Sequence, residues 1–135
     1  MKKLDLVCII DDDPIYVFGA KRVMEYTDFC SNFMIFTNGQ EALDTLGPLI
    51  KSGGHFPAVI LLDINMPVLD GWGFLDELSK VPHAKELTIF IVSSSINEDD
   101  RAKAQSYELV TSFIVKPLTK SSLQEMARQI TSSTD

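Results

Sequence analysis

Cysteine and positive charge are both scarce in this chain, and each shortage argues against a class of protein. The two cysteines, Cys8 and Cys30, form no CxxC pair or other zinc-type spacing, and Cys8 lies inside an apolar run where a reduced core residue is expected. Only 12 lysines and arginines stand against 19 acidic residues, and the resulting net charge of −7 argues against a nucleic-acid-binding surface.

Long apolar stretches are missing as well. No stretch approaches the ~18 residues that a membrane-spanning helix requires, and no signal-peptide pattern precedes the first apolar run. We therefore expect a cytoplasmic protein that binds neither membrane nor nucleic acid. Its 135 residues suit one domain over 1–135, with an ordered core over roughly 4–131 and a polar tail over 132–135.

The chain does contain a regular alternation of short apolar runs with helical patterns. The apolar runs predict strands over 6–10, 33–36, 58–62, 89–92 and 113–115. Capping and turn residues between these runs predict helix starts at Pro14, Gly39, Asp70, Asn97 and Thr119. The second helix is expected to break near Gly47-Pro48. Strands and helices in alternation predict an α/β fold with a doubly wound, five-stranded parallel sheet.

Polar side chains of complementary chemistry stand directly after four of the predicted strands. Parallel strands joined by right-handed crossovers end at the same edge of a sheet, so residues far apart in the sequence should meet there. These residues are Asp11, Asp12 and Asp13 after the first strand, Asp63 after the third, Ser93 after the fourth and Lys116 after the fifth.

Several carboxylates at one edge of the sheet require a compensating charge. Two carboxylates ~4 Å apart repel by about 4 kcal/mol at an effective dielectric constant of about 20. A Mg2+ ion would relieve this repulsion, because it binds carboxylate and carbonyl oxygens together with water and phosphate oxygens. Lys116 adds a positive charge and Ser93 a hydroxyl group. The set suits phosphoryl transfer onto a carboxylate, which depends on positioning and charge neutralisation.

Each of these residues also has a purely structural interpretation when it is taken alone. Asp13 suits a helix N-cap, Ser93 suits an ordinary loop, and an isolated Lys116 would usually be a solvated surface lysine. Their joint occurrence at four strand ends favours a functional site.

Together these motifs resemble the receiver domain of two-component response regulators. The resemblance is carried by 9–14, by 62–67 with Asp70-Gly71, by Ser93 and by 115–117, and it covers essentially the whole chain. It implies a flavodoxin-like (βα)5 fold with strand order 2-1-3-4-5. It also implies that Asp63 is the phosphoacceptor, which takes a phosphoryl group from a phosphohistidine of a sensor histidine kinase or a histidine phosphotransfer protein.

The same resemblance implies a metal site. Asp12, Asp63 and the backbone carbonyl of Asn65 would hold Mg2+, with Mn2+ as an alternative, and Asp11 would act through metal-bound water. Lys116 would complete the catalytic set together with the Ser93 hydroxyl.

A conformational switch and a mode of signalling are implied as well. Ser93 and Phe113 would form the switch, and a cis peptide bond would precede Pro117. The protein would be a single-domain regulator that catalyses only its own phosphorylation and dephosphorylation and signals to a downstream protein. It would be a monomer, or a weak homodimer through the face formed by the fourth helix, fifth strand and fifth helix. The segment 47–56 departs from the family pattern, because it is longer and richer in glycine than the usual link.

Two other classes of protein are alternatives. Asp11 and Asp13 form an Asp-x-Asp motif after a strand, which would make Asp11 the nucleophile of a haloacid dehalogenase-type phosphatase. That hypothesis leaves Asp63 and Lys116-Pro117 unexplained. A flavodoxin-like flavin carrier shares the architecture, but the acidic residues after the first strand would repel the flavin phosphate.

Overall fold

The strands of the protein run parallel in the order β2-β1-β3-β4-β5, which confirms the predicted doubly wound sheet. This computed structural model describes residues 3–54 and 56–133. The strands are β1 (Val7–Ile10), β2 (Phe33–Phe36), β3 (Val59–Leu62), β4 (Ile89–Ser93) and β5 (Val110–Val115). The helices are α1 (Pro14–Tyr26), α2 (Gly39–Lys51), α3 (Gly71–Leu78), α4 (Glu98–Gln105) and α5 (Lys120–Ser133), with a short 3-10 helix at Ala84–Glu86.

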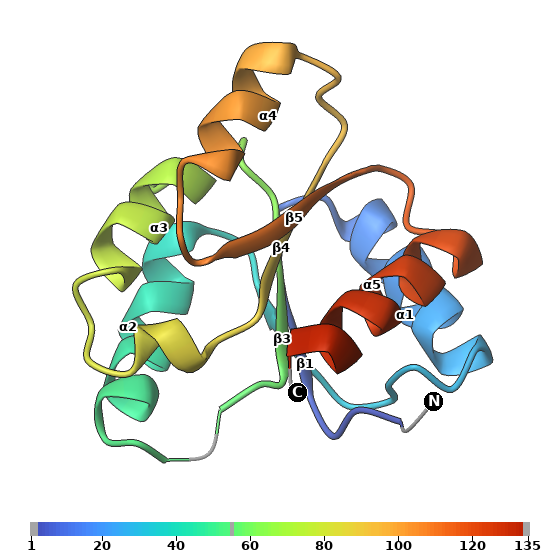
Figure 1. Ribbon diagram of the computed structural model, residues 1–135, viewed down its shortest axis with the longest axis horizontal. Helices are drawn as coiled ribbons and strands as arrows, with labels where there is room; N and C mark the ends of the chain where they lie inside the picture. Colours follow the sequence, from blue (N-terminus) through green and yellow to red (C-terminus); the bar gives the residue numbers. More distant parts are fainter. Residues whose placement is uncertain (1–2, 55, 134–135) are drawn as a thin grey trace.

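Helices cover both faces of the sheet. In Figure 1, α1 and α5 lie on one face, and α2, α3 and α4 lie on the other. Alternate residues of β1 point to opposite faces: Val7 and Ile9 pack in the apolar cluster with α1 and α5, whereas Cys8 and Ile10 pack with α2 and α3. Because both faces are buried, the central strands need apolar side chains at every position, and their sequences are accordingly continuous apolar runs.

Most helices begin at a side-chain cap. In each case a carboxylate or amide oxygen accepts a hydrogen bond from an N–H group of the first turn, which otherwise has no partner within the helix. The caps are Asp13 for α1, Asn38 for α2, Asp70 for α3 and Asn97 for α4. All four caps follow loops at the carboxyl ends of strands, so the capping interactions help to shape that edge of the sheet.

The predicted break in the second helix is wrong. Helix α2 continues through Gly47-Pro48, and the Ser52 N–H donates to the Pro48 carbonyl at 3.1 Å. A proline inside a helix costs about 3 kcal/mol, because it lacks an N–H and crowds the preceding turn. Leu46 and Ile50, which flank it in the sequence, are fully buried. Burying two such side chains contributes about 3–6 kcal/mol, which outweighs the cost.

Consequently the segment 47–56 is not a long link. Its first five residues belong to α2, and the chain leaves the helix at Ser52. Gly53 then adopts a left-handed conformation with φ of 70°, and its N–H donates to the Ile50 carbonyl at 3.0 Å. Glycine suits this position because it has no Cβ to clash in that conformation. His55 lies outside the described residues.

Two further element boundaries differ from expectation by more than one residue. Strand β5 begins at Val110, three residues before the predicted start, since Thr111 and Ser112 are tolerated in a strand at the edge of the sheet. Helix α5 continues to Ser133, so the first two residues of the expected polar tail are helical, and 134–135 lie outside the described residues. Within the described ranges, every helix is too short or too polar to cross a membrane.

Candidate functional site

The carboxyl ends of four strands meet at one edge of the sheet. The Asp63 N–H donates to the Ile10 carbonyl at 2.9 Å, which places Asp63 beside Asp11, the residue that follows Ile10. At the β4–β5 pair, the Lys116 N–H donates to the Ser93 carbonyl at 2.8 Å. Backbone hydrogen bonds therefore bring residues between 11 and 116 to a single place.

The loop after β3 holds Asp63 closely. The Ile64 N–H donates to Asp63 Oδ1 at 2.9 Å, and the Gly71 N–H donates to the Ile64 carbonyl at 3.0 Å. A Cβ on Gly71 would lie 2.5 Å from the Asp63 carbonyl oxygen, so α3 can start this close to the loop only with glycine. Asp70 completes the junction by accepting from the Gly73 N–H at 2.8 Å.

Three carboxylates and one ammonium group form the centre of the site. Asp11, Asp12 and Asp63 each offer a carboxylate oxygen, and these atoms lie within 4.8 Å of one another. Lys116 Nζ lies 2.8 Å from Asp11 Oδ2 and 3.7 Å from Asp63 Oδ2. Asp11 and Asp63 are buried, with 2% and 7% of their surface exposed, whereas Asp12 faces solvent. One lysine thus stands against three acids.

Burial and mutual repulsion change the acidity of the two buried carboxyls. Desolvation raises the pKa of Asp63 to about 6; the Asp11 charge adds to this rise and Lys116 opposes it. Desolvation also raises the pKa of Asp11, although Lys116 and the Asp13 N–H favour its ionised form. Negative charge at the site is therefore under-compensated by Lys116 alone. Mg2+ suits this donor set, because it binds a few carboxylate oxygens and keeps water at its other positions.

A tyrosine that motif analysis did not single out lies against the same ammonium group. Lys116 Nζ is 4.3 Å from the centre of the Tyr16 ring. The Tyr16 hydroxyl is buried, and no described residue forms a hydrogen bond with it. In the sequence Tyr16 counts only as an apolar position of a helix. No local pattern in the sequence could have revealed it, because Asp12 precedes the start of α1 and the partner of the ring, Lys116, follows the distant strand β5.

Other predicted residues take different places around the centre. Ser93 is the last residue of β4 and fully buried, and its Oγ accepts from the Ser95 N–H at 3.1 Å. Asp13 caps α1, where its Oδ1 accepts from the N–H groups of Ile15 and Tyr16 at 3.0 and 3.3 Å. Asn65 is exposed in the loop after Asp63.

The predicted switch residue Phe113 lies in β5 and is half-buried. The guanidinium carbon of Arg101 is 5.3 Å from the centre of its ring. Both residues line a hollow of about 400 Å3 between α4 and β5, together with Ala104 and Ser112. The peptide bond between Lys116 and Pro117 at the end of this strand is cis.

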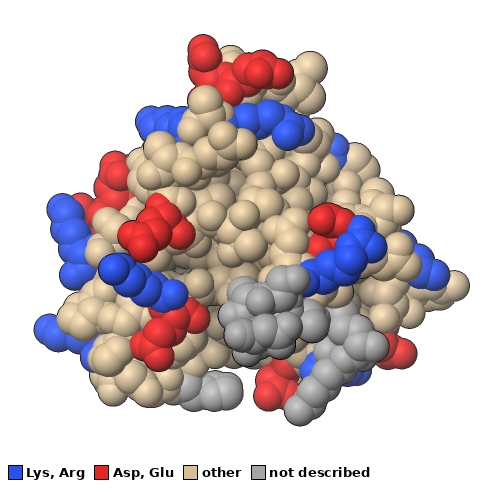
Figure 2. Space-filling model, viewed as in Figure 1, with Lys and Arg blue, Asp and Glu red and all other residues tan. Residues whose placement is uncertain are grey.

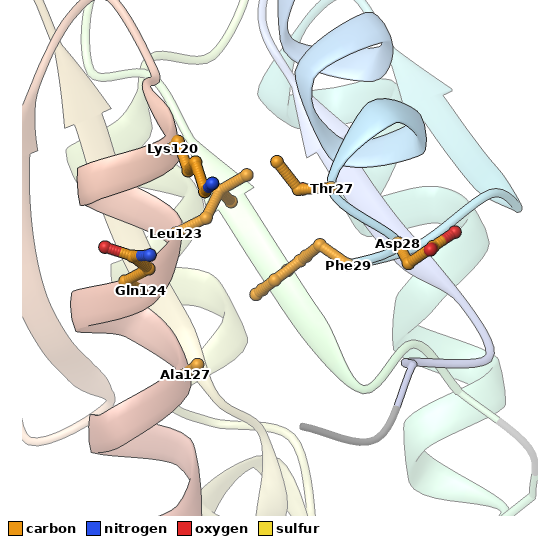
Figure 3. Close-up of a pocket in the computed structure, with 7 residues that line it drawn as sticks. All are labelled: Thr27, Asp28, Phe29, Lys120, Leu123, Gln124 and Ala127. Carbon is orange, nitrogen blue, oxygen red and sulfur yellow. The ribbon is translucent and has the colours of Figure 1, made fainter.

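A separate hollow of about 280 Å3 lies between the end of α1 and α5 (Figure 3). Thr27 and Phe29 point across it toward Lys120 and Leu123 of α5, whereas Asp28 points away. Its lining residues are all distinct from the carboxylate group, so the chemistry predicted for the strand ends belongs to the other site.

Fold and site together define a class of protein. The sheet order places two acids after β1, one acid after β3 and a lysine after β5, which is the pattern of a receiver domain. Residues 7–128 match the response regulator receiver domain family. The chain belongs to this family, and its function therefore lies in two-component signalling.

Individual relatives agree with this assignment. The chain is 36% identical over 133 residues to the response regulator Rcp1 of Synechocystis sp., and the match covers 94% of this chain and 86% of that protein. A two-component response regulator from Cytophaga hutchinsonii is similar in structure, with 30% identity, a TM-score of 0.87 and coverage of 97% of this chain and 99% of that one. The Mn2+-bound form of Rcp1 has a TM-score of 0.70 at 26% identity, over 94% of this chain and 91% of that one.

Some relatives are much longer than this chain. The sensor histidine kinase CheAY of Helicobacter pylori is 36% identical over 81 residues, which make up 60% of this chain but 10% of that protein. The similarity to such relatives concerns one part of a larger protein.

Proposed function

We propose that Asp63 accepts a phosphoryl group from a phosphohistidine of a partner protein, with Mg2+ bound beside it. One observation supports this above all: carboxylate oxygens of Asp11, Asp12 and Asp63 converge within 4.8 Å, and Lys116 Nζ lies 3.7 Å from Asp63. This arrangement offers a nucleophile, a cation site and a fixed positive charge in one place.

In the proposed reaction an Asp63 carboxylate oxygen forms a bond to phosphorus while the nitrogen–phosphorus bond of the donor breaks. The donor imidazole leaves with the electron pair of that bond, and a proton on its other ring nitrogen keeps it neutral. A pKa of about 6 leaves Asp63 largely ionised at neutral pH and therefore nucleophilic. Lys116 and the Ser93 hydroxyl would bind oxygens of the transferred group, so catalysis consists of positioning and charge neutralisation.

For the metal, we propose that Asp12, Asp63 and the backbone carbonyl of Asn65 hold Mg2+, and that Asp11 contributes through a bound water. Mn2+ would fit the same oxygen ligands. When bound, the ion would supply positive charge that offsets the charge on the phosphoryl oxygens.

Titration with MgCl2, followed by the fluorescence of Trp72, tests this ligand set. Asp12→Ala should weaken binding more than Asp11→Ala, because Asp12 is the proposed direct ligand. Equal losses for the two variants, or none, would contradict the ranking.

The phosphatase alternative makes different demands on Asp11. Asp11 Oδ1 already accepts from the Asp13 N–H at 2.9 Å, and Oδ2 lies 2.8 Å from Lys116 Nζ. Asp63 Oδ2 lies farther from Lys116 Nζ, at 3.7 Å, and Asp63 is more exposed than Asp11, 7% against 2%. These differences, together with the receiver family match, favour Asp63 as the acceptor.

We propose a histidine kinase or histidine phosphotransfer protein as the donor. Asp63 is only 7% exposed, so a donor side chain must enter between the surrounding loops. Three exposed aliphatic side chains stand on those loops and at the adjoining start of α1: Ile15, Val68 and Ile96 are 83%, 79% and 81% exposed. Val68 also has a φ of 71°, which a β-branched residue rarely adopts. Exposed apolar side chains around a reaction site support docking of a protein partner.

Output would leave through the face of α4, β5 and α5, either to a downstream protein or in a weak homodimer. Ser93 would turn its hydroxyl toward a phosphoryl oxygen, releasing the Ser95 N–H and making room for Phe113 to turn inward. Hydrogen exchange with and without beryllofluoride tests this switch: protection should change over 97–107 and 112–115. Changes confined to the metal site would contradict it.

Intact-mass analysis after incubation with acetyl phosphate and MgCl2 tests the central proposal. The protein should gain one phosphoryl group, and Asp63→Asn should gain none. Asp13→Asn is the matched control, since this neighbouring acid caps α1 and its amide can still accept the capping hydrogen bonds. Phosphorylation of the Asp63→Asn variant at the rate of the unmodified protein would rule Asp63 out.

A further inference from the structure

We infer that Tyr16 is a positioning residue that holds the Lys116 ammonium group beside Asp63. The inference rests on the proposed function of the site and adds a residue to it. Lys116 Nζ lies 4.3 Å from the centre of the Tyr16 ring, and the same atom contacts Asp11 at 2.8 Å and Asp63 at 3.7 Å. The ring face is thus a third attractive neighbour of the ammonium group.

The capped start of α1 fixes the backbone position of Tyr16 relative to the loop after β1. Asp13 Oδ1 accepts from the Tyr16 N–H at 3.3 Å, and the Asp13 N–H donates to Asp11 Oδ1 at 2.9 Å. One short run of hydrogen bonds therefore links the Tyr16 backbone, the helix cap and a carboxylate of the site, and it fixes the point from which the ring projects.

The ring offers something that the carboxylates do not. A lysine side chain has four flexible torsions, so an ammonium group stays in one place only where several neighbours attract it. Mg2+ at the site would compete with Lys116 for the carboxylate oxygens, but an aromatic face is not a ligand for this ion. The attraction between Tyr16 and Lys116 would persist in the metal-bound protein, and would keep the ammonium group where the phosphoryl oxygens arrive.

The state of the phenol group indicates that the aromatic ring, and not the hydroxyl, positions Lys116. Desolvation raises the pKa of Tyr16, and the charges of Asp11 and Asp63 raise it further, so the phenol is neutral at neutral pH. Its buried oxygen has no hydrogen-bond partner among the described residues. A phenylalanine should therefore replace the tyrosine in this role, whereas an aliphatic residue should not.

The rate of phosphorylation by acetyl phosphate with MgCl2, followed by intact mass, tests this inference. Tyr16→Leu should lower the rate about threefold to tenfold, and Tyr16→Phe should recover most of that loss. Tyr26→Leu is the matched control: it makes the same exchange on the same helix, where the side chain is 89% exposed and lies far along the helix from the site. Thermal unfolding of each variant checks that the fold is intact.

A double-mutant cycle separates positioning of Lys116 from a general structural role. In a Lys116→Ala background, Tyr16→Leu should cause no further loss, because the group that it positions is gone. The inference would be overturned if Tyr16→Leu lowered the phosphorylation rate by the same factor in both backgrounds. A Tyr16→Leu variant that is phosphorylated at the rate of the unmodified protein would overturn it as well.

A measurement without phosphoryl donor or metal completes the test. In the NMR spectrum of the metal-free protein, the ε-methylene protons of Lys116 should be shifted upfield of those of the exposed Lys120, because this methylene group is bonded to the Nζ that lies over the Tyr16 ring. Tyr16→Leu should remove the shift and Tyr16→Phe should keep it. If the unmodified protein showed this shift but accepted no phosphoryl group, the proposed function would fail while the contact stood. Absence of the shift would overturn the contact itself.

Discussion

Helices α3 and α4 have the same length and begin at neighbouring strand-end loops, but they are attached to the sheet in opposite ways. Helix α3 buries Gly71, Phe74, Leu75 and Leu78 in the core. Helix α4 buries only Ala104, and its first turn carries three acids, Glu98, Asp99 and Asp100. Figure 2 shows acidic side chains gathered over the tip of α4, with basic side chains next to them.

Helix α4 has no wide apolar face, and contacts between individual side chains attach it to the rest of the domain instead. Lys103 Nζ lies 4.9 Å from the centre of the Trp72 ring of α3. Trp72 in turn stacks on Tyr107, just beyond α4, with ring centres 5.7 Å apart. The Tyr107 hydroxyl donates to Asp76 of α3 at 2.8 Å. Burial of apolar side chains stabilises α3 strongly and together with the rest of the core, whereas each contact of α4 contributes little and can be lost on its own. We therefore expect α3 to open only with the whole domain and α4 to open locally, as suits an element that transmits a signal.

The largest expected change in the free energy of unfolding comes from a substitution in α3. Phe74→Ala should lower the free energy of unfolding by about 3–5 kcal/mol, since the ring is fully buried and its removal leaves a cavity. Arg101→Ala in α4, which removes the contact with Phe113, should cost about 1 kcal/mol or less. Urea denaturation measures both. Similar losses for the two variants would mean that α4 is anchored as firmly as α3.

A smaller effect is expected from Asp63, which precedes the loop into α3. Its pKa in the folded protein is about 6, above its ordinary value of 3.8, so the folded state binds more protons than the unfolded state between these values. Stability of the metal-free protein should therefore fall as pH rises from about 4 to about 6. Above that range, Asp63→Asn should be more stable than the unmodified protein by about 3 kcal/mol.

Hydrogen exchange in EDTA tests whether this gain in stability protects the amides of α3 and α4 to different extents. Amides of α3, which should exchange through global unfolding, should become better protected in Asp63→Asn at pH 7. Amides of α4, which should exchange through local opening, should stay unchanged. At pH 4 the gain in α3 should vanish. An equal gain in both helices would show that they open together.

A still smaller effect is expected at the contact between the helices. Tyr107→Phe removes the hydrogen bond to Asp76 and should lower the free energy of local opening in α4 by about 1 kcal/mol. Exchange rates of the α4 amides measure this change, while global stability should move less. Tyr26→Phe, at an 89% exposed position, is the control. A purely global loss would contradict a local role.

The smallest effect concerns the cation above the tryptophan. Lys103→Met keeps a long side chain but removes the charge above Trp72, and should cost about 0.5 kcal/mol of local stability in α4. Because Trp72 is the only tryptophan, its fluorescence reports the change directly. An unaltered emission spectrum together with unaltered exchange of α4 amides would show that the charge does not stabilise the helix.

The arrangement of the site could be predicted because it depends on residues that directly follow strands. Asp11, Asp63 and Lys116 each stand after an apolar run, and in a parallel sheet such positions converge however the helices pack. The contacts of α4 could not be predicted in this way. Trp72 and Tyr107 are 35 residues apart in sequence numbering (107 minus 72), and no local pattern pairs them. The same holds for Pro48, whose effect on α2 depends on how much apolar surface its neighbours bury.

The amino-acid sequence by itself determined the element order, the parallel sheet and the strand-end chemistry, because apolar periodicity and capping are properties of short segments. Only the tertiary structure decided the distances within the site: carboxylate oxygens of Asp11, Asp12 and Asp63 lie within 4.8 Å of one another, and Asp13, for which the sequence left both a cap and a site role open, caps α1. It also decided that Lys116 lies against the ring of Tyr16. These positions depend on side chains from β1, α1, β3 and β5 packing against one another, and no segment of the chain carries that information alone.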